Sequence, residues 1–500
     1  PNPSANPVDR KSRGTDILSG VRHPRKEARF VMGIARQFVG IPWRWIARFG
    51  MQRPGVAIAI ATVAMTLGTR PGGAAEMLAA ARTSIRAAEA RKHVLALADD
   101  ALEGREGGSR GGRAAAGYIV SHIEKLSLEP AGDSGGYYQP VGSLRNILAL
   151  SRGGDPSVAD ELVVVGAHYD HVGYGNAGNS YGPFGFVHNG ADDNASGVAG
   201  LIELAEAIEH LPQRPRRPIL FAFWDGEEKG LLGSSHFVRV PSAAVAGMKP
   251  VFSFNLDMIG RLRGDRLVVY GSRTAEGLRS SIVQANNSAG VKPLEVFFDW
   301  AIDEDSDHYP FIVAKVPTVM FHTGLHDQYH RPSDDVQFVN FEGIEPVTRV
   351  ALEFIVAIAD GPGAARGFRS QCRSESNTTK RALEAPAGDV VAARIQSPPG
   401  VRGGEDGARN EPARPRWGLG TRSDSGEPRS PVVVRVSAGS AAAAAGVVVG
   451  DRVTAVDGVP LESQADMVAR LAAAAARVSL DLERKGRLIR VEMLARDSAE

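Results

Sequence analysis

Potential metal ligands follow four short apolar runs in the middle of this 500-residue chain. ELVVVGAH ends at His168, RPILFAFW leads into Glu227 and Glu228, PVFSFNLD ends at Asp257, and KVPTVMFH leads into a loop that contains His330. Imidazole and carboxylate groups are the ligands of zinc sites that use no thiolate. Chance alone would have to place such a group after every one of these runs. The pattern therefore predicts a metal site.

A further motif, HNGADDNASG, places Asp192 and Asp193 side by side in a turn before an amphipathic stretch. These carboxylates could cap the helix that follows, because negative charge offsets the positive end of the helix dipole. They could also join the ligands at the strand ends. The motif alone leaves both interpretations open.

The elements that must position these residues follow from the apolar pattern. Continuous runs of β-branched and aromatic residues are typical of strands buried on both faces, as in a parallel sheet. The stretch DNASGVAGLIELAEAIEHL between the first two runs has helical spacing. We therefore expect an α/β domain over 77–362, with a mostly parallel central sheet and helices on both faces. Ligands bind beyond the carboxyl ends of such strands.

The motifs GAHYDH, NGADDNASG, FWDGEE, NLDMIG, SDH and YHRPSD occur in this order. Together they resemble the zinc aminopeptidases of metallopeptidase family twenty-eight, over the 77–362 domain. The resemblance implies two Zn²⁺ ions per chain. One ion would bind His168 and Asp257, the other would bind Glu228 and His330, and Asp192 would bridge them.

The same resemblance implies roles for other residues. Glu227 would be the general base, Asp170 would orient the imidazole of His168, and Tyr329 would stabilise an oxyanion. Asp193 would set the geometry of Asp192 and cap the helix, and the peptide bond between these two residues is typically cis in the family. The remaining histidines of the region are expected to support the site or to pack: His171, His188, His308, His322 and His326.

The predicted function is an exported di-zinc aminopeptidase that removes N-terminal residues from peptide substrates. Carboxypeptidase action on an unusual peptide stays open. Two other classes on the same fold are alternatives: a glutaminyl cyclase, which uses one zinc ion, and a non-catalytic binding protein. No HExxH motif is present, so zinc proteases with that helical motif are excluded. The formal charge of +1 gives no reason to expect a nucleic-acid partner.

The first 75 residues suggest export. Residues 1–50 are basic and begin with Pro, and we interpret them as upstream read-through or a disordered segment. From Met51 a short apolar stretch and small residues are typical of a signal peptide over 51–75, and the stretch is too short for a stable membrane span. A periplasmic or secreted location follows. The alternative is a membrane-surface segment around IPWRWIARF.

The last part of the chain predicts a linker and a second domain. Residues 363–413 are rich in Gly, Pro, Arg and Ser, which favours a flexible linker. It holds Cys372, the only cysteine, so no disulfide can form within the chain. Residues 414–495 resemble a PDZ domain, a small α+β fold. Trp417–Gly418–Leu419–Gly420 would be its carboxylate-binding loop, which implies a peptide C-terminus or a protein as partner.

Overall fold

The computed structural model describes residues 78–361, 366–387 and 417–495. The predictions for 1–50 and 51–75 therefore lie outside the described residues. In the described ranges, no helix combines the length and apolar character needed to cross a bilayer.

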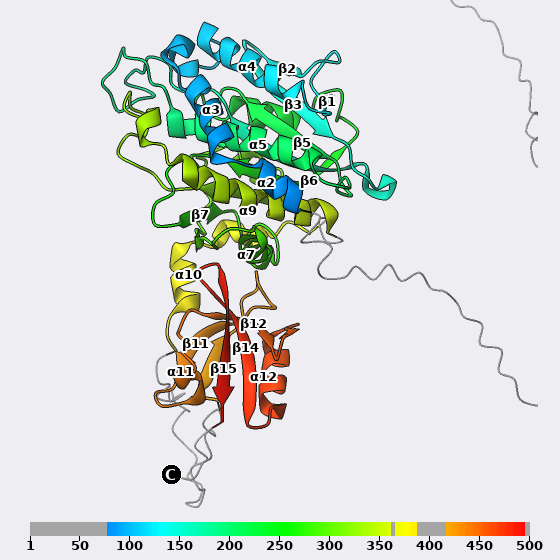
Figure 1. The fold of residues 1–500 in the computed structure, drawn as a ribbon, viewed down its shortest axis with the longest axis vertical. Helices are drawn as coiled ribbons and strands as arrows, with labels where there is room; N and C mark the ends of the chain where they lie inside the picture. The colour runs from blue at the N-terminus through cyan, green and yellow to red at the C-terminus, as the bar shows by residue number, and fades with distance from the viewer. Residues whose placement is uncertain (1–77, 362–365, 388–416, 496–500) are drawn as a thin grey trace, which may run out of the picture. The chain divides into compact units, whose positions relative to one another are not determined.

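The first domain is built on a nine-stranded mixed sheet (Figure 1). Its strands are β1 (Glu129–Pro130), β2 (Tyr138–Val141), β3 (Leu144–Ser151), β4 (Glu161–His168), β5 (Ile219–Trp224), β6 (Lys249–Leu256), β7 (Arg266–Tyr270), β8 (Glu295–Phe298) and β9 (Thr318–His322). The central strands β5, β4, β6 and β9 are parallel neighbours, in that order. Strand β3 pairs antiparallel with β5, and β7 pairs antiparallel with β9. The four predicted strands are thus the parallel centre, and antiparallel strands extend it on both sides.

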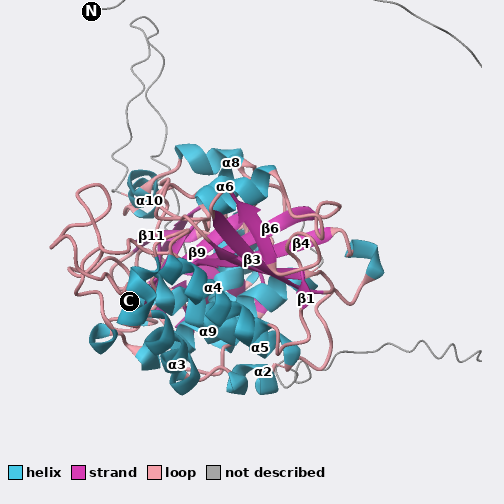
Figure 2. Ribbon diagram, turned by 90° about the horizontal axis from the view of Figure 1, so that it is seen from above, coloured by secondary structure: helices cyan, strands magenta, loops and turns pink. Residues whose placement is uncertain are grey.

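Helices cover both faces of this sheet, as Figure 2 shows. One face carries α2 (Ala79–Ser84), α3 (Ala87–Leu97), α4 (Arg110–Ile123), α5 (Gly197–Glu209) and α9 (Phe341–Asp360), and the other carries α6 (Leu232–Arg239) and α8 (Tyr309–Val313). Along β4, Val163 and Val165 belong to one apolar core and Val164 to the other, because successive side chains point to opposite faces. The expected fold class is confirmed.

The start of α5 is held close to β6. A Cβ atom on Gly197 would lie 2.6 Å from the carbonyl oxygen of Leu256, which no real side chain tolerates. Glycine therefore allows the turn 191–196, which contains both adjacent aspartates, to approach the end of β6. Helix α5 itself is apolar on nearly all sides and buried, as expected for a helix inside a layered domain.

The second domain is a small α+β unit. Its strands are β10 (Leu419–Arg422), β11 (Val432–Val436), β12 (Arg452–Val456), β13 (Val459–Pro460), β14 (Arg477–Arg484) and β15 (Arg487–Leu494), and all pairings are antiparallel. Helices α11 (Ala441–Ala444) and α12 (Gln464–Ala473) complete it. Val433, Val453, Leu480 and Leu482 are fully buried in its own core. The predicted second fold is confirmed.

The described part of the predicted linker, 366–387, is structured. It contains η5 (Ser370–Ser374) and α10 (Asn377–Glu384). The backbone N–H of Arg369 donates to the carbonyl of Thr274 (2.7 Å), and the N–H of Ala387 donates to the carbonyl of Val434 (2.8 Å). The expectation of a flexible linker is wrong for this stretch. Hydrogen bonds and ion pairs order it, and those leave no apolar signature in a sequence.

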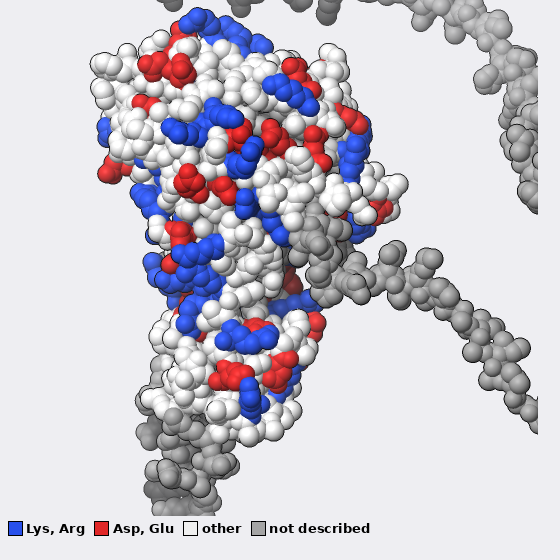
Figure 3. Space-filling view, viewed as in Figure 1, with Lys and Arg blue, Asp and Glu red and all other residues white. Residues whose placement is uncertain are grey.

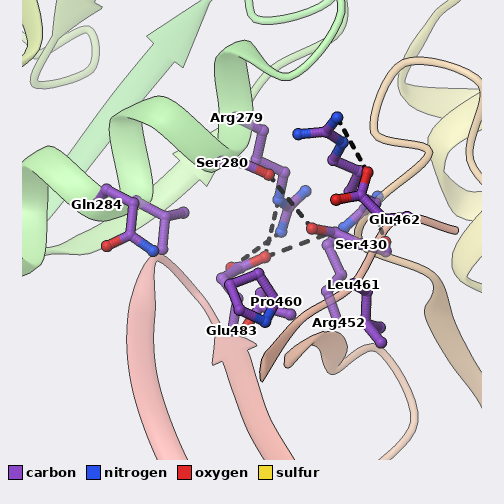
Figure 4. Close-up of a pocket in the computed structure, with 12 residues that line it drawn as sticks. Arg279, Ser280, Gln284, Ser430, Arg452, Pro460, Leu461, Glu462 and Glu483 are labelled. Atoms are coloured by element: carbon purple, nitrogen blue, oxygen red, sulfur yellow. Dashed lines mark hydrogen bonds and ion pairs between the residues drawn. The ribbon is translucent and has the colours of Figure 1, made fainter. Parts of the chain in front are cut away.

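A cluster of buried charges, which we call the interdomain cluster, joins α7 (Leu278–Ser288) to the second domain. Two guanidinium nitrogens of Arg279 lie 2.9 and 3.1 Å from the carboxylate oxygens of Glu483 (Figure 4). Asp424 lies 2.6 Å from Nη1 of Arg273 and 2.9 Å from Nη2 of Arg452. The cluster also includes Glu375, which pairs with Arg273 (2.8 Å) and Arg369 (2.9 Å), and the buried Glu427, whose Oε1 accepts from the N–H of Arg279 (2.7 Å). On the face shown in Figure 3, surface charges of both signs are interspersed.

Candidate metal centre

Two of the predicted ligands, His168 and Asp257, lie at the carboxyl ends of parallel strands and come together with Asp193. His168 is the last residue of β4, and Asp257 follows the last residue of β6. The Nε2 atom of His168 lies 3.4 Å from Oδ1 of Asp257 and 3.4 Å from Oδ1 of Asp193. These three buried groups could hold one metal ion.

A second group lies on the other side of Asp193. The Nε2 atom of His330 is 3.1 Å from Oδ2 of Asp193 and 3.1 Å from Oε2 of Glu228. Nδ1 of His171 is 2.7 Å from Oε1 of Glu228 and 3.7 Å from Oδ2 of Asp193. The two oxygens of Asp193 therefore face two different groups of donors.

Asp193, and not Asp192, occupies the shared position. Oδ1 of Asp192 accepts hydrogen bonds from the N–H of Gly260 (2.6 Å) and the hydroxyl of Ser196 (2.9 Å), and its Oδ2 lies 3.2 Å from Nε2 of His326. Asp192 thus faces away from the ligand groups. Asp193 has extended backbone angles that turn its side chain toward them, and the cis peptide bond joins Asp193 to Asn194. The shared position expected for Asp192 belongs to Asp193, and the cis bond expected between Asp192 and Asp193 lies one residue later.

Asp334 holds this turn in place. Its Oδ2 accepts from the backbone N–H groups of both Asp192 and Asp193, each at 3.0 Å, and its Oδ1 receives a hydrogen bond from Nη2 of Arg261 (3.0 Å). Sequence reasoning missed this residue, although it lies in the quoted YHRPSD motif. A carboxylate that positions backbone has no spacing rule of its own.

His171 was also expected to play only a supporting part, yet it lies within ligand distance of the second group. The only signal for it is its position, three residues after His168 in the same strand-end loop. The other histidines do not enter either group. His188, for example, has its Nδ1 2.8 Å from the carbonyl of Phe186 and its Nε2 2.7 Å from the hydroxyl of Ser180.

The charges of the site favour positive ions. Burial opposes an imidazolium at both positions, but Glu227 and Asp257 raise the pKa of His168 well above its ordinary value. In the same way Asp193 and Glu228, close to His330, raise its pKa to about 11. Oδ2 of Asp193 and Oδ1 of Asp257 are buried without a properly aligned hydrogen bond among the described residues. Such unpaired oxygens with imidazoles nearby fit a metal bound through N and O.

Glu227 and Tyr329 line the same cavity, of about 150 Å³, as the donors His168, Asp193, Asp257 and His330. Burial raises the pKa of Glu227 well above its ordinary value, and neighbouring Glu228 adds to this. The ring of Tyr329 stacks on His330 with centroids 3.9 Å apart, and burial also raises the pKa of its hydroxyl. Both side chains therefore face the place where a substrate would react.

Asp170 contacts His168 chiefly through its main chain. Nδ1 of His168 lies 3.2 Å from the carbonyl oxygen of Asp170 and 3.9 Å from its Oδ1. Oδ1 instead accepts from the backbone N–H of Glu227 (3.1 Å). Asp170 thus links the loop after β4 to the loop after β5, and its carbonyl is better placed than its carboxylate to orient the imidazole.

Comparison with known proteins finds a family match within each domain. Residues 146–355 match peptidase family M28, and residues 432–484 match the PDZ domain. Aminopeptidase YwaD of Bacillus subtilis is 29% identical over 191 residues, which cover 37% of this chain and 38% of that protein. Leupeptin-inactivating enzyme 1 of Streptomyces exfoliatus is 31% identical over 174 residues, which cover 34% of each. The chain thus spans about a third of the length of these relatives.

Among solved structures, the LapA aminopeptidase of Legionella pneumophila is similar with a TM-score of 0.48 and 18% identity, over 57% of this chain and 75% of that one. The described domain of this chain combines an α/β fold with groups at its strand ends that could hold metal ions. The match to peptidase family M28 covers residues 146–355, and the match to the PDZ domain follows it in the chain.

Proposed function

We propose that this chain is an aminopeptidase that uses two zinc ions to hydrolyse the first peptide bond of its peptide substrates. The observation that carries the proposal is the position of Asp193, whose two carboxylate oxygens face two separate groups of donors. A carboxylate shared in this way is the arrangement that two-metal hydrolases need. It also argues against the single-zinc cyclase alternative.

The proposed ligands follow from the distances. His168, Asp193 and Asp257 would hold one ion, and Asp193, Glu228 and His330 would hold the other. His171, 2.7 Å from Glu228, would fix the orientation of that carboxylate. Ser306 does the same for Asp257, because its hydroxyl donates to Oδ2 (2.7 Å).

When bound, a zinc pair supplies Lewis acidity toward the scissile carbonyl and lowers the pKa of a coordinated water. Glu227 takes the proton of the attacking water and returns it to the leaving amine nitrogen. The hydroxyl of Tyr329 donates a hydrogen bond to the oxyanion. Asp170 keeps the loop of Glu227 in register with His168.

The test combines metal analysis with two sets of peptides. The purified full chain is expected to contain two zinc ions and to cleave peptides with a free N-terminus, but not the same peptides after N-acetylation. A chelator should abolish cleavage, and added zinc should restore it. One zinc ion per chain with cyclisation of N-terminal glutamine would support the cyclase instead, and equal cleavage of free and blocked peptides would reject an aminopeptidase.

The second domain is proposed to capture a peptide C-terminus. Strand β10 pairs only with β11 among the described strands, so its other edge has no described partner strand. Helix α12 lies next to β10, because Nε2 of Gln464 donates to the carbonyl of Thr421 (2.8 Å). Export to the periplasm or the medium remains part of the proposal, and fractionation of the producing cells would test it. Binding of a labelled peptide to the full chain, with and without a C-terminal amide, tests the groove.

A further inference from the structure

The cavity that contains the proposed metal site is also lined by apolar side chains and by one further carboxylate. Met258, Met320 and the ring of Tyr270 form an apolar side, and both methionines are almost fully buried. Asp305 lines the same cavity, with its side chain 51% exposed. Apart from Glu227 and the proposed metal ligands, the cavity offers apolar side chains and the single carboxylate of Asp305, which together match a side chain with an apolar stem and a charged end.

Asp305 has no cationic partner among the described residues. The one ion-pair contact found for it is Nε2 of His308, at 3.9 Å. Burial lowers the pKa of His308 to about 4, so this imidazole is neutral at physiological pH. Burial raises the pKa of Asp305 to about 6, and the nearby carboxylates of Asp257 and Asp303 add to the effect. A positive charge entering the cavity would offset this repulsion.

The position of Asp305 is fixed relative to the proposed zinc site. It directly precedes Ser306, whose hydroxyl donates to Oδ2 of Asp257 (2.7 Å) and accepts from Nδ2 of Asn255 (2.8 Å). The carboxylate is therefore attached to the same frame as a metal ligand. A substrate residue bound next to the metal ions would lie at a constant distance from the carboxylate of Asp305.

Outside the proposed metal site, His322 and Tyr270 are the other polar groups in the lining of the cavity, and they do not compete for a cation. Nδ1 of His322 accepts a hydrogen bond from the N–H of Gly324 (2.6 Å), so its other ring nitrogen carries a proton when the ring is neutral. Burial lowers the pKa of His322, which keeps the ring neutral. Burial raises the pKa of Tyr270 to about 12, so its hydroxyl stays protonated.

We propose that this cavity receives the side chain of the substrate's first residue and that Asp305 selects lysine or arginine there. This inference rests on the proposed aminopeptidase function and specifies its substrate class. The four-carbon stem of lysine would lie along Met258 and Met320. Its ammonium group would lie against Asp305, in a partly desolvated place where a charge pair counts for more than at the open surface.

The test compares lysine with norleucine, which has the same unbranched stem without the ammonium group. With zinc-loaded full chain and 4-nitroanilides of both residues, kcat/KM is expected to be about tenfold higher for lysine. The variant Asp305→Asn should bring this ratio close to one. Glu304→Gln, an exposed change in the same loop at a residue that does not line the cavity, should leave the ratio as it is, and zinc content checks that each variant is folded.

The outcomes separate this inference from the function on which it rests. Cleavage of norleucine as fast as lysine by the parent protein would overturn the choice of basic residues and leave the aminopeptidase intact. An equal loss for both substrates in Asp305→Asn would show that Asp305 serves the shared α-amino group, which also overturns it. Failure of the parent to cleave either anilide would remove the proposed function itself.

Discussion

Two clusters of buried charge in this chain have opposite balances. In the interdomain cluster, four guanidinium groups form ion pairs with four carboxylates: Arg273, Arg279, Arg369 and Arg452 with Glu375, Glu384, Asp424 and Glu483. At the metal centre, carboxylates outnumber nearby cations. The buried Arg105 beneath it donates to four backbone carbonyls and to no carboxylate.

The difference separates a structural role from a functional one. A buried group of charges that is neutral in itself needs no further partner. A buried group with excess carboxylates needs positive charge from elsewhere, and here two ions would provide it. The balance of charge, and not burial alone, marks the site that takes a ligand.

The largest expected effect comes from the adjacent aspartates. Asp193→Asn should lower kcat/KM by at least about 10³-fold and reduce bound zinc, because it removes the shared ligand. Asp192→Asn keeps an oxygen able to accept from Gly260 and should retain both ions. The zinc content and the rate of peptide hydrolysis of the two variants test this prediction. If Asp192→Asn loses more zinc and more activity than Asp193→Asn, Asp192 is the shared ligand.

Substitutions of the adjacent residues Glu227 and Glu228 should also differ in their effect on bound zinc. Glu227→Gln is expected to lower kcat by about 10²–10⁴-fold with zinc content unchanged, because it removes only the base. Glu228→Gln should lose metal as well. Full activity of Glu227→Gln would exclude it as the base.

A smaller effect is expected in the interdomain cluster, where a substitution should lower the stability of the protein without a loss of bound metal. Glu483→Gln leaves the buried Arg279 with only the more distant carboxylate of Glu384 (3.7 Å) and should destabilise the protein by up to about 3–5 kcal/mol. The double variant Arg279→Met, Glu483→Met removes both charges and should be close to the parent. Thermal unfolding and zinc content of the same samples check this. A single variant as stable as the parent would mean that water already screens the pair.

Glu203 is a buried carboxylate outside both clusters. Glu203 on α5 is 1% exposed, accepts from the N–H of Arg86 (3.0 Å), and lies 3.9 Å from His93, whose pKa is lowered to about 4 by burial. Burial raises the pKa of Glu203 to about 7. Because its folded pKa lies above the unfolded one, stability is full below about pH 4.5 and falls as pH rises toward 7, by up to about 3 kcal/mol.

Glu203→Gln should therefore unfold at a higher temperature than the parent near pH 8 and at a similar temperature near pH 4. Glu206→Gln, a change on the same helix, is the matched control and should show a smaller difference between these pH values. If the difference in unfolding temperature between the parent and Glu203→Gln does not change with pH, the pKa of Glu203 is not raised in the folded protein.

The sequence predicted the parallel centre of the sheet, because strands buried on both faces leave continuous apolar runs. It also predicted that His168, Glu228, Asp257 and His330 lie at one edge, since parallel strands end together. It could not decide between Asp192 and Asp193, because two adjacent carboxylates share every spacing rule and only the backbone angles separate them. His171 and Asp305 depend on loop conformation, which no periodicity describes.

Cys372 gives the protein a built-in chemical reporter. It is the chain's sole thiol, it lies fully buried in η5, and burial raises its pKa. A maleimide dye should therefore label the native protein slowly and at one place only. The labelling rate then measures how often the stretch 366–387 detaches from its surroundings, without any engineered residue.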